Sequence, residues 1–126
     1  MMKGLDSIFV WIIQEIQTFG FSRTDPTKPI EVKGWIPYSS HKKANGQLDE
    51  VVTEILVNGN SVATYKSKED KVFDIKISQD KVKDIIAKDQ FYDLEIRVNS
   101  QFTPSKISNS KDERSLSEII SFIGEE

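Results

Sequence analysis

The sequence from 91 to 98 reads Phe91-Tyr92-Asp93-Leu94-Glu95-Ile96-Arg97-Val98, and this stretch decides the fold class. Apolar side chains at the even positions alternate with charged side chains at the odd positions from Asp93 onward. A period of two is typical of a strand with one buried face and one face in water. The stretch therefore predicts a strand that lies over a hydrophobic core.

Other short segments of the chain repeat this pattern. Strands are predicted at 30–36, 51–57, 61–65 and 73–77, with Gly34 as a candidate bulge. Asn58-Gly59 predicts a type I′ hairpin, because these residues readily take positive φ. Ser78 is a candidate N-cap for a short helix that ends at Ala87. The set predicts a mainly β fold, an antiparallel immunoglobulin-like β-sandwich with one short inserted helix.

The N-terminal segment has the spacing of an amphipathic helix from Leu5 to Phe19, whose apolar positions fall on one face. Val10 and Trp11 lie outside that face and mark a candidate interaction surface. Three interpretations stay open: partial cover by the sandwich, self-association or docking to another chain, and peripheral attachment to a membrane. The predicted organisation is an N-terminal helix at 1–21, a linker at 22–29 and a β-sandwich domain at 30–126.

Composition excludes several function classes. The chain has 126 residues, 17 basic and 20 acidic side chains and a net charge of −3, which disfavours a nucleic-acid partner. It contains no cysteine, so disulfides and thiolate chemistry are excluded. No apolar run approaches the roughly 18 residues that a transmembrane segment needs. No small-residue cleavage site follows the N-terminal apolar run, and a cytoplasmic location is expected.

No arrangement of residues predicts catalysis, a metal site or a cofactor. The single histidine, His41, falls in a lysine-rich polar loop predicted at 39–46, without a flanking nucleophile motif, and is expected to be solvated. Glycine-rich phosphate-binding motifs are absent from the sequence. Asp93 and Glu95 form the best candidate carboxylate pair for glycoside hydrolysis, but an alternating charged face is more often the wet side of a sheet.

Aromatic residues give the candidate ligand site. Sugars stack on aromatic rings while neighbouring polar groups bind their hydroxyls. Trp35, Tyr38 and Tyr65 are the candidate rings, and His41, which lies close to Trp35 and Tyr38 in the sequence, is a further candidate ligand-binding residue. The alternative is that Trp35 fills the core of the sandwich and that Tyr38 covers its end.

A polar loop of about a dozen residues follows the strand at 91–98, and loops of this length are often functional or held by specific contacts. Asp112 and Arg114 lie where the loop turns back toward an apolar ending. Arg114 is a candidate to bind a glycan carboxylate or hydroxyls. Alternatively, Arg114 bonds loop carbonyls while Asp112 accepts backbone N–H groups, which fixes the loop.

The end of the chain also carries a family resemblance. The pattern consists of Phe102-x-Pro104-Ser105, then Asp112-x-Arg114-x-Leu116, then Ile120 and Ile123. It resembles the closing signature of small β-sandwich modules attached to bacterial polysaccharide-biosynthesis enzymes, such as glycosyltransferases and sugar-modifying methyltransferases. Glycine usually follows the leucine in that family, and Ser117 stands in its place here. The resemblance covers the last quarter of the chain, with a looser match of strand spacing from Gly34 onward.

The resemblance has consequences for both fold and function. The segment 117–123 fits a helix or a strand by its spacing, and the resemblance favours the strand. It implies a non-catalytic accessory module, with catalysis on another domain or polypeptide and a glycosyltransferase-type enzyme as a candidate partner. The alternative is a free-standing carbohydrate-binding protein that uses the 35–41 loop. A small enzyme with a carboxylate pair is the third hypothesis.

Overall fold

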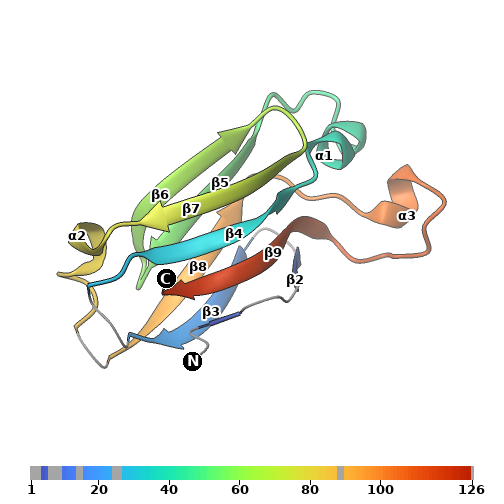
Figure 1. Cartoon of the computed structure of the whole chain (residues 1–126). Coiled ribbons are helices and arrows are strands. Elements are labelled where there is room, and N and C mark those ends of the chain that lie inside the picture. Colours follow the sequence, from blue (N-terminus) through green and yellow to red (C-terminus); the bar gives the residue numbers. More distant parts are fainter. Residues whose placement is uncertain (1–3, 6–9, 14–15, 24–26, 88–89, 126) are drawn as a thin grey trace.

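Two antiparallel sheets form the protein (Figure 1), and the computed structural model describes residues 4–5, 10–13, 16–23, 27–87 and 90–125. In the first sheet, β1 (Gly4–Leu5) and β2 (Val10–Ile13) both pair with β9 (Leu116–Glu125), which is followed by β4 (Ile30–Ile36) and β7 (Lys71–Ile77). The second sheet has the order β3 (Ile16–Ser22), β8 (Phe91–Val98), β5 (Val51–Val57) and β6 (Asn60–Ser67). The predicted antiparallel β-sandwich is therefore confirmed.

The hydrophobic core lies between the two sheets. Along β4, β7 and β8 the core side chains occupy alternate positions, as the period of two requires. The core includes Ile30, Val32 and Ile36 of β4, Phe73, Ile75 and Ile77 of β7, Ile55 and Val57 of β5, Leu94, Ile96 and Val98 of β8, and Ile120 and Ile123 of β9. The strand at 91–98 thus covers the core as predicted, and the ending at 117–123 is a strand.

The predicted hairpin is also confirmed. Asn58 has a φ of 48° and Gly59 a φ of 83°, and the pair connects β5 to β6. Gly34 marks an irregularity between β4 and β9, since the pairing shifts register between Lys33 and Gly34. A Cβ atom at Gly34 would meet the backbone carbonyl of Ile119 on β9 and would lie 2.7 Å from the ring of Phe73, so this position requires glycine for close packing.

The predicted N-terminal helix is wrong in the residues that the structure describes. Residues 10–13 and 16–22 form β2 and β3 instead, while 6–9 and 14–15 lie outside the described residues. The apolar spacing fits a helix, but β-branched and aromatic side chains also favour strands. Pairing with β9 and β8 gives this segment backbone partners in both sheets, and that tertiary context decides its structure.

Short helices occupy three of the connections. The inserted helix is confirmed, although α2 (Gln79–Val82) is shorter than predicted and Ser78 makes no side-chain cap bond. The polar loop predicted at 39–46 is wrong, because Tyr38–Ala44 form α1 directly after Pro37. A third helix, α3 (Pro104–Ile107), lies in the long loop between β8 and β9. None of the helices in the described part of the chain has the length and apolarity to cross a bilayer.

The predicted linker at 22–29 joins β3 to β4, and residues 24–26 of it lie outside the described residues. Its start is not a solvated spacer. Arg23 is buried and lies 3.9 Å from the carboxylate of Glu125 at the end of β9, and its guanidinium donates to the carbonyl of Lys28 at 2.9 Å. This contact ties the connection to both sheets, because β3 and β9 belong to different ones.

Candidate functional site

Two short helices, α1 and α3, lie against each other beside the sandwich, although about 60 residues separate them in the sequence. Proline begins each of them: Pro37 is the N-cap of α1 and Pro104 is the first residue of α3. Proline suits these positions because it fixes φ and lacks an N–H group that the first turn would leave unpaired. The two helices form the walls of the candidate site.

An open groove of about 290 Å³ lies between α1 and α3. Its apolar part is formed by Phe102, Pro104 and Ile107. Its polar part is formed by Ser39, Ser40 and Lys43 of α1 and by Ser108 after α3. An apolar surface beside several hydroxyl groups and one ammonium group is chemically suited to a polar ligand that has one apolar face.

His41 lies beneath this groove and does not face solvent. Its side chain is fully buried, and its two ring nitrogens lie 3.0 Å from the hydroxyl of Ser100 and 2.7 Å from the carbonyl of Ser117. Because a carbonyl only accepts, Nε2 donates to Ser117 and Nδ1 accepts from Ser100. Burial lowers the pKa of His41, while the bond to Ser117 opposes this shift. The expectation of a solvated loop histidine is therefore wrong.

Phe102 connects the groove to the body of the protein. Its ring lies edge-on to His41, with centroids 5.0 Å apart, and edge-on to Trp11 of β2 at 6.0 Å. The backbone of Phe102 also pairs with Leu116 at the start of β9. Edge-to-face pairs of this kind stabilise aromatic clusters. The apolar floor of the groove is thus anchored on β2, α1 and β9.

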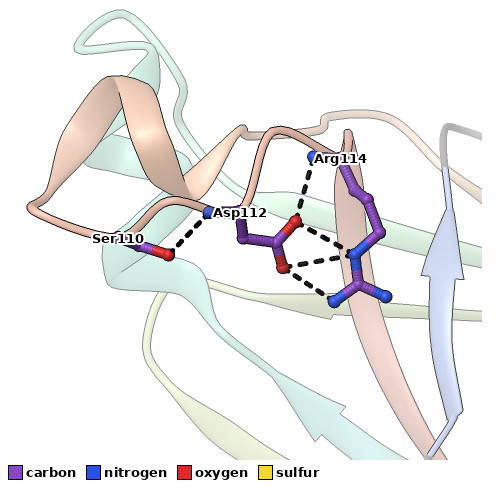
Figure 2. A network of polar contacts seen from close by, with 3 residues as sticks. All are labelled: Ser110, Asp112 and Arg114. Atoms are coloured by element: carbon purple, nitrogen blue, oxygen red, sulfur yellow. Dashed lines mark hydrogen bonds and ion pairs between the residues drawn. The ribbon is translucent and has the colours of Figure 1, made fainter.

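The loop that carries α3 is held by an ion pair (Figure 2). The guanidinium of Arg114 donates to the carboxylate of Asp112 at 2.7 Å, and the backbone N–H of Arg114 donates to the same carboxylate at 3.0 Å. Ser105 of α3 donates its N–H to the carbonyl of Asp112 at 2.9 Å, and Asp112 donates its own N–H to the hydroxyl of Ser110 at 3.1 Å. The bonds from Arg114 hold the pKa of Asp112 at about 2.

This geometry bears on the two interpretations of the pair. Asp112 accepts a backbone N–H, as a loop-fixing role requires. Arg114 bonds the carboxylate of Asp112, whereas the prediction had it bonding loop carbonyls. Two donor nitrogens of Arg114, Nε and Nη2, bond the carboxylate of Asp112, and this favours the loop-fixing interpretation.

The predicted aromatic ligand residues do not meet in one place. Trp35 of β4 is 36% exposed and belongs to the outer face of the first sheet, where its cross-strand partners are Ile119 and Val72. Tyr38 is partly buried and donates its hydroxyl to the carbonyl of Asp49 at 2.9 Å. Tyr65 packs against the core residue Phe73, with ring centroids 5.9 Å apart. The 35–41 segment therefore contributes Ser39 and Ser40 to the groove, while its aromatic rings lie elsewhere.

The predicted interaction surface also has a different environment from the one expected. Trp11 is partly buried and its ring contacts Phe102, which matches the open alternative of partial cover by the sandwich. Val10 pairs with Ile120 of β9 through the backbone register. The carboxylate candidates, Asp93 and Glu95, lie on β8, and Glu95 forms an ion pair with Arg97.

No buried carboxyl group was predicted from the sequence, and Glu118 is the most buried of those that the structure describes. Glu118 of β9 is fully buried between the sheets, where the hydroxyl of Thr53 on β5 donates to its Oε2 atom. No described protein atom bonds its Oε1 atom, which burial leaves without solvent. Burial raises the pKa of Glu118 to about 8, against the opposing effect of the Thr53 bond. The sequence does contain a sign of this buried carboxyl group, because Glu118 is the one charged residue between Leu116 and Ile123 in a mainly apolar ending.

Comparisons with known proteins give little beyond this geometry. No family model matches the chain, and no curated protein matches it. Among solved structures, a carbohydrate-binding module CBM36 in complex with calcium and xylotriose has a TM-score of 0.43 and 11% identity, covering 90% of this chain and 77% of that chain.

A second similar structure is the CBM36-1 domain of a multidomain xylanase from the hindgut metagenome of Trinervitermes trinervoides. Its TM-score is 0.42 at 6% identity, and the match covers 98% of this chain and 90% of that chain. At these scores, the two likenesses carry no information about the ligand of this chain.

Proposed function

We propose that this chain is a non-catalytic β-sandwich binding module that binds a saccharide in the groove between α1 and α3. The observation that carries the proposal is the chemistry of the groove: Pro104 and Ile107, next to the mostly buried ring of Phe102, offer apolar surface beside the hydroxyls of Ser40 and Ser108. A pyranose ring has the matching character, with an apolar face and a rim of hydroxyls.

Two features support a binding role without chemistry. His41 is the only histidine in the chain, and both of its nitrogens are hydrogen-bonded in the interior, so it is unavailable as a general base. The groove is also held in place before any ligand arrives, by the aromatic contacts of Phe102 and the ion pair between Asp112 and Arg114. A preformed site loses less conformational entropy on binding.

We further propose that the module serves a polysaccharide-biosynthesis enzyme, in line with the resemblance of its C-terminal signature. Phe102 and Pro104 of that signature line the groove, and Asp112 and Arg114 fix the loop around it. In this role the groove holds a glycan while a separate domain or polypeptide supplies catalysis.

Calorimetric titration of the full chain with a panel of neutral and acidic oligosaccharides tests the saccharide proposal. Ile107→Gln removes apolar surface from the groove and is expected to weaken binding about tenfold or more, since burial of such a side chain contributes roughly 1.5–3 kcal/mol. The matched control is Trp35→Ala, which changes an aromatic side chain outside the groove. Thermal melting verifies that each variant stays folded.

Two outcomes overturn the proposal. In the first, no member of the panel binds the folded protein. In the second, Trp35→Ala abolishes binding while Ile107→Gln leaves it intact, which would move the site to the outer face of the first sheet.

A further inference from the structure

One charged side chain lines the groove between α1 and α3. Seven residues line the groove, and Lys43 is the only charged residue among them. None of these lining residues carries a carboxylate. Lys43 is exposed near the end of α1, so its ammonium group is accessible to a ligand. The groove therefore presents a positive charge beside an apolar surface.

Two charged side chains near Lys43 and Ser39 make hydrogen bonds within the protein. On α1, the ammonium of Lys42 donates to the carbonyl of Leu48 at 2.6 Å. The carboxylate of Asp70 accepts from the N–H of Ser39 at 2.7 Å and from its hydroxyl at 2.9 Å.

In the part of the chain that the structure describes, no ion pair joins Lys43 to a carboxylate. In the loop that carries α3, the carboxylate of Asp112 is paired with Arg114. Lys43 is thus the cation of this groove that a ligand can pair with.

We infer that the groove selects acidic saccharides, with a ligand carboxylate bonded to the ammonium of Lys43. This inference rests on the proposed function and names the class of saccharide. The apolar face of the sugar ring lies over Pro104 and Ile107, and its hydroxyls bond Ser40. The hydroxyl of Ser108 donates to the carbonyl of Pro104 at 2.9 Å and accepts from the N–H of Ser110, so toward the sugar it acts as an acceptor. Hydrogen bonds between charged groups are shorter and roughly twice as strong as those between neutral groups, so the carboxylate dominates selectivity.

Acidic oligosaccharides and their methyl esters test the inference, because esterification removes the charge and keeps the sugar. The panel contains tetragalacturonate, a glucuronate oligosaccharide and sialyllactose, each beside its methyl ester, titrated calorimetrically into the full chain. At least one acidic member is expected to bind about tenfold more tightly than its ester, the ratio that roughly 1.4 kcal/mol gives. Lys43→Gln is expected to remove that difference.

A second lysine provides the matched control. Lys111 is exposed in the loop that carries α3 but does not line the groove, so Lys111→Gln is expected to keep the preference for the acidic member. Raising the sodium chloride concentration from about 50 mM to about 500 mM is expected to weaken binding of the acidic member more than of its ester, because salt screens charge.

The outcomes separate the inference from the function on which it rests. Equal binding of acid and ester, unchanged by Lys43→Gln, overturns the acidic preference and leaves the saccharide site standing. A preference that survives Lys43→Gln but is lost in Lys111→Gln overturns the assignment of Lys43. Failure of every acidic and neutral member to bind the folded protein overturns both.

Discussion

Replacing Glu118 with glutamine is expected to remove a large part of the pH dependence of stability between pH 6.5 and 8. Glu118 is fully buried and its only described hydrogen-bond partner is the hydroxyl of Thr53. Burial raises its pKa from 4.5 to about 8. The folded protein therefore keeps the proton on Glu118 at neutral pH, whereas the unfolded chain releases it.

The sign and the size of the effect follow from proton linkage. Below pH 4.5 both states are protonated, and the contribution of Glu118 to the free energy of unfolding is fully present. As the pH rises toward 8, that free energy falls by about 1.4 kcal/mol per pH unit. Over the window from pH 6.5 to 8, the loss is about 2 kcal/mol.

The choice of window keeps the opposing effect of His41 small, and comparison of the variant with the wild type cancels what remains. Burial lowers its pKa below 6.5, so the unfolded chain gains a proton at His41 as the pH falls below that value, and the folded protein does not. His41 therefore reduces stability on the acid side only. Burial also raises the pKa of Glu31 above 4.5, and comparison of the variant with the wild type cancels its contribution.

Urea unfolding followed by tryptophan fluorescence measures the effect at pH 6.5, 7.25 and 8. The wild type is expected to lose about 2 kcal/mol more than Glu118→Gln across this range. Glu113→Gln makes the same change at an exposed position and is expected to follow the wild type. Parallel curves for the wild type and Glu118→Gln would refute the assignment of a protonated carboxyl between the sheets.

Two further substitutions test the packing and the loop. Gly34→Ala is expected to lower the free energy of unfolding by about 1–3 kcal/mol, because its methyl group meets the backbone carbonyl of Ile119 and the ring of Phe73. Gly20→Ala, with no atom closer than 3.9 Å, is the control, and equal urea midpoints for the two variants would contradict this packing. Arg114→Ala is expected to lower the melting temperature, and the difference from the wild type shrinks as the pH falls from about 4 toward about 2, where Asp112 loses its charge. An unchanged melting temperature at pH 7 would show that the ion pair does not hold the loop.

Local signals predicted most of the sandwich. The alternation at 91–98 and the positive φ that Asn58-Gly59 readily adopts are properties of adjacent residues, so one sequence suffices to read them. The helix prediction for the N-terminal segment was wrong for a physical reason. Its apolar spacing fits a helix, and only pairing with β8 and β9, about 75 to 120 residues away, makes it form strands.

The candidate site was less predictable because long-range contacts build it. His41 is buried by partners that lie 59 and 76 residues away, which no local pattern reveals. The resemblance singled out Phe102 and Pro104, and both line the groove. Lys43 and Ser108 carried no signal of their own, since a lysine and a serine in polar segments are ordinary surface residues.

The most direct test of the central claim is a nuclear magnetic resonance titration of the ¹⁵N-labelled chain with a saccharide from the acidic panel. If the groove between α1 and α3 is the binding site, the amide signals that shift most will belong to residues 38–44 and 102–108. Shifts centred on Trp35 and its neighbours in β4 and β7, or no shifts at saturating saccharide, would contradict the account.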